Sequence, residues 1–216
     1  MALGFSFSGG GSSGDIIPIV KYDARAGRMM RRDRVNGEYD SVDITRTFKA
    51  VMDLENIEVG TINFNTGGAP DFAVARIGTP PPPPPSADHK PGCRMLIKLG
   101  KDCGGDIREL SATAKVFLRG LDDLHTAYMA GVKENPGKLP VVALKETVAI
   151  TSGEGARKST NYAPVFEITG WVARPTDLVY VPKARAEAPA PVASAAAPST
   201  GSTPVAPPAA SEDDFG

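Results

Sequence analysis

The stretch LPVVALKETVAITSGEGARKSTNYAPVFEITGWVA, residues 139–173, decides the fold class. Its apolar and β-branched residues predict two long strands, one from Val141 to Thr151 and one from Tyr162 to Ala173. The residues between these strands are rich in glycine and carry two basic side chains. The stretch therefore predicts a long β-hairpin with a flexible, cationic loop.

Shorter strands are predicted before this hairpin. Apolar and more polar residues alternate from Phe48 to Glu55, which is typical of a strand with one buried face. The dipeptide Asn36-Gly37 favours a tight hairpin turn between two further strands. Other apolar runs that predict strands are Ile16–Val20, Ile57–Phe64, Phe72–Ile77 and Arg94–Leu99.

One long helix is predicted after these strands. Apolar residues recur every three or four positions from Leu110 to Tyr128, and this spacing makes a single apolar stripe along a helix. Ser111 can cap the start of the helix, and Asn135-Pro136-Gly137 stops it. Several strands with one amphipathic helix predict a mainly β fold, a small Greek-key barrel of the oligonucleotide-binding (OB) type.

Composition divides the 216 residues into three parts. Residues 1–14 are predicted to be a flexible Gly/Ser-rich segment, and residues 15–183 a single OB-like domain. Residues 184–216 are predicted to be a disordered Ala/Pro-rich tail with an acidic tip. Within the domain, Pro80–Pro85 predicts a stiff polyproline II rod, either a spacer between strands or a docking ligand for a proline-binding module.

The net charge of -1 conceals a separation of charge along the chain. The tail is acidic, whereas residues 21–34 hold six basic residues against two acidic ones. One interpretation is an exposed pair of strands whose charges only keep the protein soluble. The other is a strip that neutralises the phosphates of a nucleic acid. The basic residues of this strip are Lys21, Arg25, Arg28, Arg31, Arg32 and Arg34.

Aromatic residues near the basic strip favour the second interpretation. Proteins that bind single-stranded nucleic acid combine phosphate contacts with stacking of bases on aromatic rings. Tyr22 lies inside the strip, and Tyr39 follows the predicted turn. We expect Tyr22 and Tyr39 to stack bases, while Arg157 and Lys158 close over the nucleic acid from the hairpin loop.

Trp171, the single tryptophan, is a third candidate for stacking. Strand alternation places Phe166, Ile168 and Val172 on one face and Trp171 on the other. The face with Phe166 and Ile168 is the more apolar, so Trp171 is expected to be at least partly exposed. The alternative is a tryptophan packed under a loop or under the helix.

Motifs for catalysis are not found in the sequence. It has no phosphate-binding glycine loop ending in Lys-Ser or Lys-Thr, no nucleophile elbow and no His-Glu-x-x-His helix, so we predict a non-enzymatic protein without a cofactor. His89, Cys93, Cys103 and His125 are the residues that could bind zinc, but their spacing is too loose for a compact zinc motif and we predict no metal site. No apolar run predicts a signal peptide or a membrane span, and we expect a cytoplasmic protein.

The sequence resembles phage and bacterial single-stranded DNA-binding proteins. The segments DLENIEVG (residues 53–60) and NYAPVFEITGW (residues 161–171) are similar to those of phage-encoded early proteins of this kind. The chain also ends in an acidic tip that contains a phenylalanine, as such proteins do, although here Gly216 follows Phe215. The resemblance implies an OB fold and a tip that recruits replication or recombination proteins through Glu212, Asp213, Asp214 and Phe215.

These observations together predict a protein that coats and protects single-stranded DNA in replication, recombination or repair, in the host cytoplasm if it is phage encoded. The acidic tip also suggests a second role, because it can occupy the cationic strip until DNA displaces it. A phage structural or assembly protein, with the proline rod and the tail as interaction elements, is the alternative. The sequence leaves open whether the chain is a monomer or a homo-oligomer, and whether it prefers DNA or RNA.

Overall fold

The computed structural model describes residues 17–35, 38–65 and 69–182. Within these ranges the chain forms ten strands, one α-helix and four short 3-10 helices. The strands are β1 (Ile19–Asp23), β2 (Arg28–Val35), β3 (Glu38–Asp43), β4 (Lys49–Met52), β5 (Glu58–Asn63), β6 (Asp71–Arg76), β7 (Lys90–Leu99), β8 (Ile107–Ala112), β9 (Lys138–Ser152) and β10 (Ser159–Ala173). The predicted mainly β class is therefore confirmed, while the predicted segments 1–14 and 184–216 lie outside the described residues.

The strands form one mixed sheet in the order β10-β9-β4-β7-β8-β1-β2-β3, with β5 paired to β7 and β6 paired to β5. Only the β1–β8 pair is parallel among the strand pairs of the described residues. Strand β7 branches the sheet, because its first half pairs with β5 and its second half with β4. The long hairpin predicted from residues 139–173 is the β9–β10 pair.

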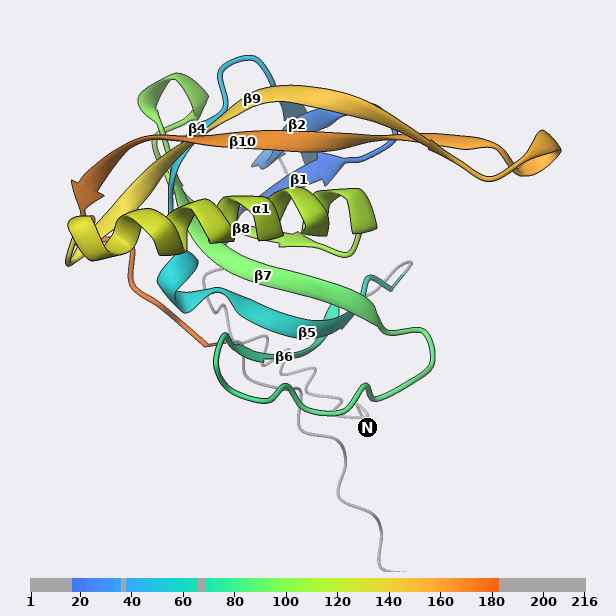
Figure 1. Ribbon diagram of the computed structural model, residues 1–216, viewed down its shortest axis with the longest axis horizontal. Coiled ribbons are helices and arrows are strands. Elements are labelled where there is room, and N and C mark those ends of the chain that lie inside the picture. Colours follow the sequence, from blue (N-terminus) through green and yellow to red (C-terminus); the bar gives the residue numbers. More distant parts are fainter. Residues whose placement is uncertain (1–16, 36–37, 66–68, 183–216) are drawn as a thin grey trace, which may run out of the picture. The chain divides into compact units, whose positions relative to one another are not determined.

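Strand β7 is buried on both faces, which explains its nearly continuous apolar sequence. On one face, Met95 and Ile97 join the main hydrophobic core, which includes the apolar stripe of helix α1 (Lys115–Gly131). On the other face, Leu96 joins a smaller cluster with Leu139 and Leu178. In Figure 1, α1 lies between β10 and β7.

The helix begins later than the apolar spacing predicts. Leu110 and Ser111 belong to β8, and α1 starts at Lys115 after Ala114, which makes no side-chain cap. Leu110 is buried as a strand residue opposite Met95 of β7. Its place in the stripe is a coincidence of spacing, because pairing with the central strands outweighs local helix propensity.

The sheet curls so that the turn between β1 and β2 meets β10. The Tyr162 N–H donates a 2.7 Å hydrogen bond to the Ala24 carbonyl, and the Tyr22 hydroxyl donates one of 2.8 Å to the Tyr162 carbonyl. Gly27 in this turn has φ of +66°, and a Cβ there would lie 2.9 Å from the Tyr162 Cβ. Glycine is therefore required at position 27 both by the turn and by the close approach.

After β10 the chain crosses the face of the sheet opposite α1 as a closing segment, residues 174–182. Arg174 donates two hydrogen bonds of 2.8 Å to the buried carboxylate of Asp53, and Leu178 is fully buried. Tyr180 donates to Glu58, and the Val181 carbonyl accepts from Arg94. These contacts fix the last described residues of the chain on the sheet.

Candidate nucleic-acid interface

Strand alternation divides the basic strip of residues 21–34 between two faces of β2. Met29 is fully buried and packs in the core, and Arg31 and Asp33 share its side of the strand. Arg28, Arg32 and Arg34 lie on the opposite, outer side. The basic residues that are adjacent in the sequence therefore lie on two different faces of the sheet.

Two arginines of the strip are held by carboxylates of the same sheet. Arg28 forms a 2.7 Å ion pair with Asp43 of β3, and Arg31 forms a 2.8 Å ion pair with Asp33. Arg31 also donates a hydrogen bond to the Cys103 carbonyl. Partial burial alone would raise the pKa of Asp33, but hydrogen bonds from Arg108 and then Arg31 outweigh it and hold the pKa below its ordinary value. Arg31 thus stabilises the fold.

The other outer cations have no such partner. Lys21 of β1, Arg32 and Arg34 make no ion pair within 4.0 Å with any carboxylate of the described residues. The Arg32 guanidinium lies 5.6 Å from the centre of the Tyr39 ring, and Tyr39 is 57% exposed. Arg25 is exposed in the β1–β2 turn, where Asp23 accepts hydrogen bonds from the backbone.

Three hollows adjoin one another, of which the first lies on this outer side and the third lies at the ends of β5 and β7. The first, of about 220 Å³, is lined by Tyr39, Arg32 and Arg34. It shares Ile19 and Arg32 with a second hollow of about 460 Å³, which Lys21 also lines. Together with a third hollow they form what we call the outer groove.

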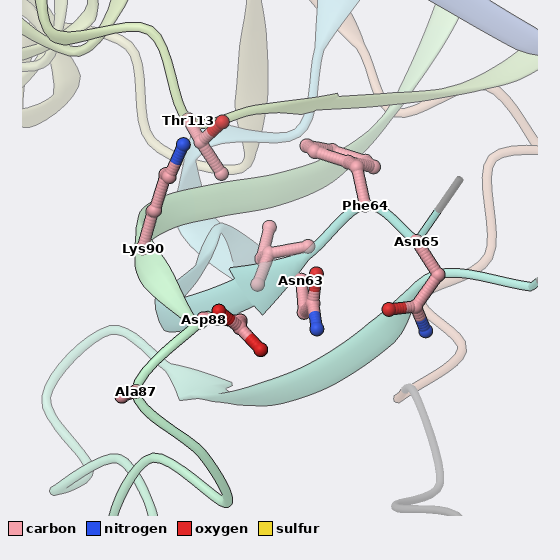
Figure 2. Close-up of a pocket in the computed structure, with 8 residues that line it drawn as sticks. Asn63, Phe64, Asn65, Ala87, Asp88, Lys90 and Thr113 are labelled. Atoms are coloured by element: carbon pink, nitrogen blue, oxygen red, sulfur yellow. The ribbon is translucent and has the colours of Figure 1, made fainter.

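The third hollow, of about 430 Å³, shares Phe64 and Thr113 with the second. Figure 2 shows Phe64 and Lys90 on opposite sides of it, with Thr113 between them along one rim. Phe64 is 45% exposed although its ring is wholly apolar. The outer groove is therefore lined by two exposed aromatic rings and by four cations, Lys21, Arg32, Arg34 and Lys90.

Two carboxylates also line the outer groove. Glu109 accepts a 2.8 Å hydrogen bond from the buried guanidinium of Arg94, which also pairs with Glu58. Asp88 lies in the third hollow, near Lys90 in the sequence, and is exposed. Cations outnumber these two acids, and the groove carries a net positive charge.

Phe64 and Lys90 were not among the residues predicted for the site. Phe64 ends a run of strand residues and precedes a polar, glycine-rich loop, and Lys90 stands at the start of β7 before Pro91. Phe64 is in phase with the buried Ile62, so alternation alone predicts a core position for it, and no clear signal in the sequence identifies its exposure.

The predicted stacking role of Tyr22 is wrong: Tyr22 is among the residues that line the second hollow, but its ring is packed in the core. It is 5% exposed, and its ring centre lies 5.3 Å from that of Phe117 in the core. Burial, with the nearby charge of Asp23, raises the pKa of Tyr22 to about 12. Tyr22 falls on the core side of β1 with Val20, whereas Lys21 falls on the outer side.

Trp171 is half-buried, and a β-bulge changes the face on which it lies. The pairing of β10 with β9 shifts between Ile168 and Gly170, so the alternation that assigns Val172 to the core is interrupted. Val172 is exposed, whereas Trp171 packs against the core and stacks on Tyr128 at 5.7 Å between ring centres. The structure thus gives Trp171 a packing role, away from the lining of the outer groove.

The remaining predicted residues are not brought into the outer groove. Arg157 and Lys158 are exposed at the tip of the β9–β10 hairpin and line none of the three hollows. Glu212, Asp213, Asp214 and Phe215 lie outside the described residues. Besides Tyr22, whose ring is buried, the outer groove therefore contains four of the predicted binding residues, Lys21, Arg32, Arg34 and Tyr39.

The four candidate zinc ligands, His89, Cys93, Cys103 and His125, each contact different residues. His89 contacts Ser86 and Asp71, and the His125 ring lies beside Tyr128. Cys93 is buried, which raises the pKa of its thiol to about 12, and Cys103 donates a hydrogen bond to the Thr47 carbonyl. Among the described residues, no three His, Cys, Asp or Glu side chains are grouped so that they could hold a metal ion.

Comparisons with models of protein families, with curated proteins and with solved structures find no match to this chain. In the described ranges, no helix has both the length and the apolar character needed to cross a membrane.

Proposed function

We propose that this protein binds single-stranded DNA in the outer groove and protects it during replication, recombination or repair. The observation that carries the proposal is the combination of Tyr39 and Phe64, both exposed, with cations that have no carboxylate partner within salt-bridge distance in the described residues. Exposed rings stack unpaired bases, and the cations neutralise the phosphates between them. Base pairs of a duplex are already stacked on each other, so this arrangement favours single strands.

An OB-like barrel is the architecture that we propose for this function. The hydrogen bond from Tyr162 to Ala24 supports closure of the curled sheet, because it joins the β1–β2 turn to β10, the strand at one end of the sheet order. In this proposal the protein is not an enzyme and needs no cofactor. Its acidic tip, Glu212 to Phe215, would recruit replication or recombination proteins, and the resemblance to phage proteins suggests that it acts in a bacterial cytoplasm.

Binding of fluorescent oligo-dT at several salt concentrations tests the proposed function. Four groove cations on the phosphates of a single strand give a slope of about -3 for the logarithm of affinity against the logarithm of salt concentration. Anisotropy should also show weaker binding of a duplex of the same length, and an oligo-rU arm measures the preference between DNA and RNA. Affinity that does not change with salt, or that is equal for the duplex, would contradict the proposal.

A further inference from the structure

The distal half of the β9–β10 hairpin, residues 145–163, forms a two-stranded arm. Strand β9 pairs with β4 only from Val141 to Ala143, and the last backbone contact on that side is the Leu144 N–H to the Phe48 carbonyl. From Lys145 to Ser152, no other strand of the described residues pairs with the outer edge of β9. Figure 1 shows the arm extending beyond the other labelled elements.

Hydrogen bonds at the base of the arm determine which backbone groups point outward from it. The N–H and the carbonyl of Tyr162 are both directed away from β9, to Ala24 and to the Tyr22 hydroxyl. In an antiparallel pair such a residue lies opposite a partner whose N–H and carbonyl also point outward. That partner is Ala149. By the period of two, Thr147, Ala149 and Thr151 present their backbone donors and acceptors on the open edge of β9.

Beyond Lys145 and Glu146, where the pairing with β10 also has a register shift, the open edge lacks the features that proteins use to block strand pairing. Natural edge strands carry charges, prolines or bulges where pairing must be prevented. Residues 147–152 contain no charge and no proline. Val148 is 45% exposed, and Ile150 on the same face is half-buried. A two-stranded ribbon of this kind gains little stability alone, and further strands are needed to stabilise it.

The residues of this edge are also nearly symmetric about Ala149, in the order Thr147, Val148, Ala149, Ile150, Thr151. A two-fold interface requires a surface that is complementary to itself. Antiparallel pairing of the segment with a second copy places Ala149 opposite Ala149 and each Thr147 opposite Thr151 as hydrogen-bonded pairs. Each Val148 then faces Ile150 of the other copy, and pairs of β-branched side chains stabilise a sheet.

We propose that this edge is a dimerisation surface, on which the β9 strands of two copies pair about a two-fold axis at Ala149. The arms then form one four-stranded ribbon in the order β10-β9-β9-β10. The length of the edge fits this register, since it is bounded by Leu144 at one end and by the turn at Gly153 at the other. The register also brings Lys145 to within one residue of Glu154 of the second copy. The occupant is a second chain because the edge matches itself.

Analytical ultracentrifugation of the full chain without DNA, at concentrations from about 1 to about 100 µM, tests the proposal by mass action. We expect a monomer–dimer equilibrium that Ala149→Pro weakens at least about tenfold, because proline removes the outward N–H and leaves the bonds to β10 intact. The matched control is Thr160→Pro, which removes an outward N–H from the other edge of the same arm and should leave dimerisation unchanged. A chain that is monomeric throughout, or equal loss in both variants, overturns the proposal.

Cross-linking tests the register independently. Ala149→Cys places two thiols on the two-fold axis, so a short bis-maleimide should link two chains, whereas Thr160→Cys should not be linked. The native Cys93 and Cys103 are 2% and 1% exposed and should not react. Absence of a covalent dimer from Ala149→Cys, or equal yields from both variants, overturns the register. Neither experiment contains DNA, so failure of the DNA-binding proposal would leave this result standing.

Discussion

Two groups of arginines in this protein differ in their partners. Arg94, Arg108 and Arg174 each contact two carboxylates, and Arg94 does so while 2% exposed. Arg32 and Arg34 of the outer groove form no ion pair among the described residues, and Arg32 instead lies over Tyr39. A buried charge is tolerated only where it is matched, whereas an unmatched charge must stay in contact with solvent or with a ligand. The first group therefore stabilises the fold, and the second is available to phosphates.

The largest effect is expected from breaking the first group. Arg94→Ala removes the buried guanidinium that pairs with both Glu58 and Glu109, so the free energy of unfolding should fall by about 3–5 kcal/mol. Urea denaturation, monitored by circular dichroism, measures this change in the free energy of unfolding. Arg34→Ala is the control, with a change within about 0.5 kcal/mol because Arg34 is exposed. Similar stability losses in both variants would remove the distinction between the groups.

A smaller effect, on DNA rather than on stability, is expected from the second group. Arg32→Ala should weaken oligo-dT binding about 3- to 10-fold at low salt and make the salt slope shallower by about 1, since one phosphate contact is lost. The matched variant is Arg28→Ala, also on the outer side of β2 but already paired with Asp43. Anisotropy titrations at three salt concentrations compare them. If Arg28→Ala has the greater effect on affinity, pairing does not decide which arginines bind.

The smallest effect is expected on the free energy of unfolding at acidic pH. The pKa of Asp33 is lowered in the folded protein by Arg108 and Arg31, against the effect of burial. Its contribution to stability is therefore present above the unfolded pKa of about 3.9 and is lost as the pH falls below that value. Asp33→Asn should flatten the decline in the free energy of unfolding between about pH 5 and pH 3. Asp88→Asn, in the groove without an arginine partner in the described residues, serves as control, and an unchanged decline in Asp33→Asn would contradict the assignment.

The strands were largely predictable, because alternation and turn residues are local signals. The hairpin of residues 139–173 corresponds to β9 and β10, and the alternation after Phe48 corresponds to β4. The start of the helix was not predictable, since Leu110 fits a helical stripe equally well and only its pairing with Met95 makes it a strand residue. Spacing describes one chain segment, whereas pairing depends on a second segment distant in the sequence.

The site was predictable only in part, for a similar reason. Lys21, Arg32, Arg34 and Tyr39 were predicted from charge and aromatic content, and all four line the outer groove. The stacking role predicted for Tyr22 was wrong because the alternation of β1 turns its ring into the core. Trp171 packs against Tyr128 because a bulge next to Gly170 interrupts the alternation of β10, and that glycine inside the strand was the local signal for the bulge. Phe64 and Lys90 join the groove through the pairing of β5 with β7, which brings together residues 26 positions apart.

The most direct test of the account is the affinity of Tyr39→Ala/Phe64→Ala for oligo-dT at one fixed salt concentration. Stacking of a base on an aromatic ring contributes about 1–3 kcal/mol, so the double variant should bind at least about 30-fold more weakly than the parent protein. The control Tyr39→Phe/Phe64→Tyr keeps both rings and should bind within about threefold of the parent. An unchanged affinity in a double alanine variant that unfolds at the parent's urea concentration would contradict single-stranded DNA binding in the outer groove.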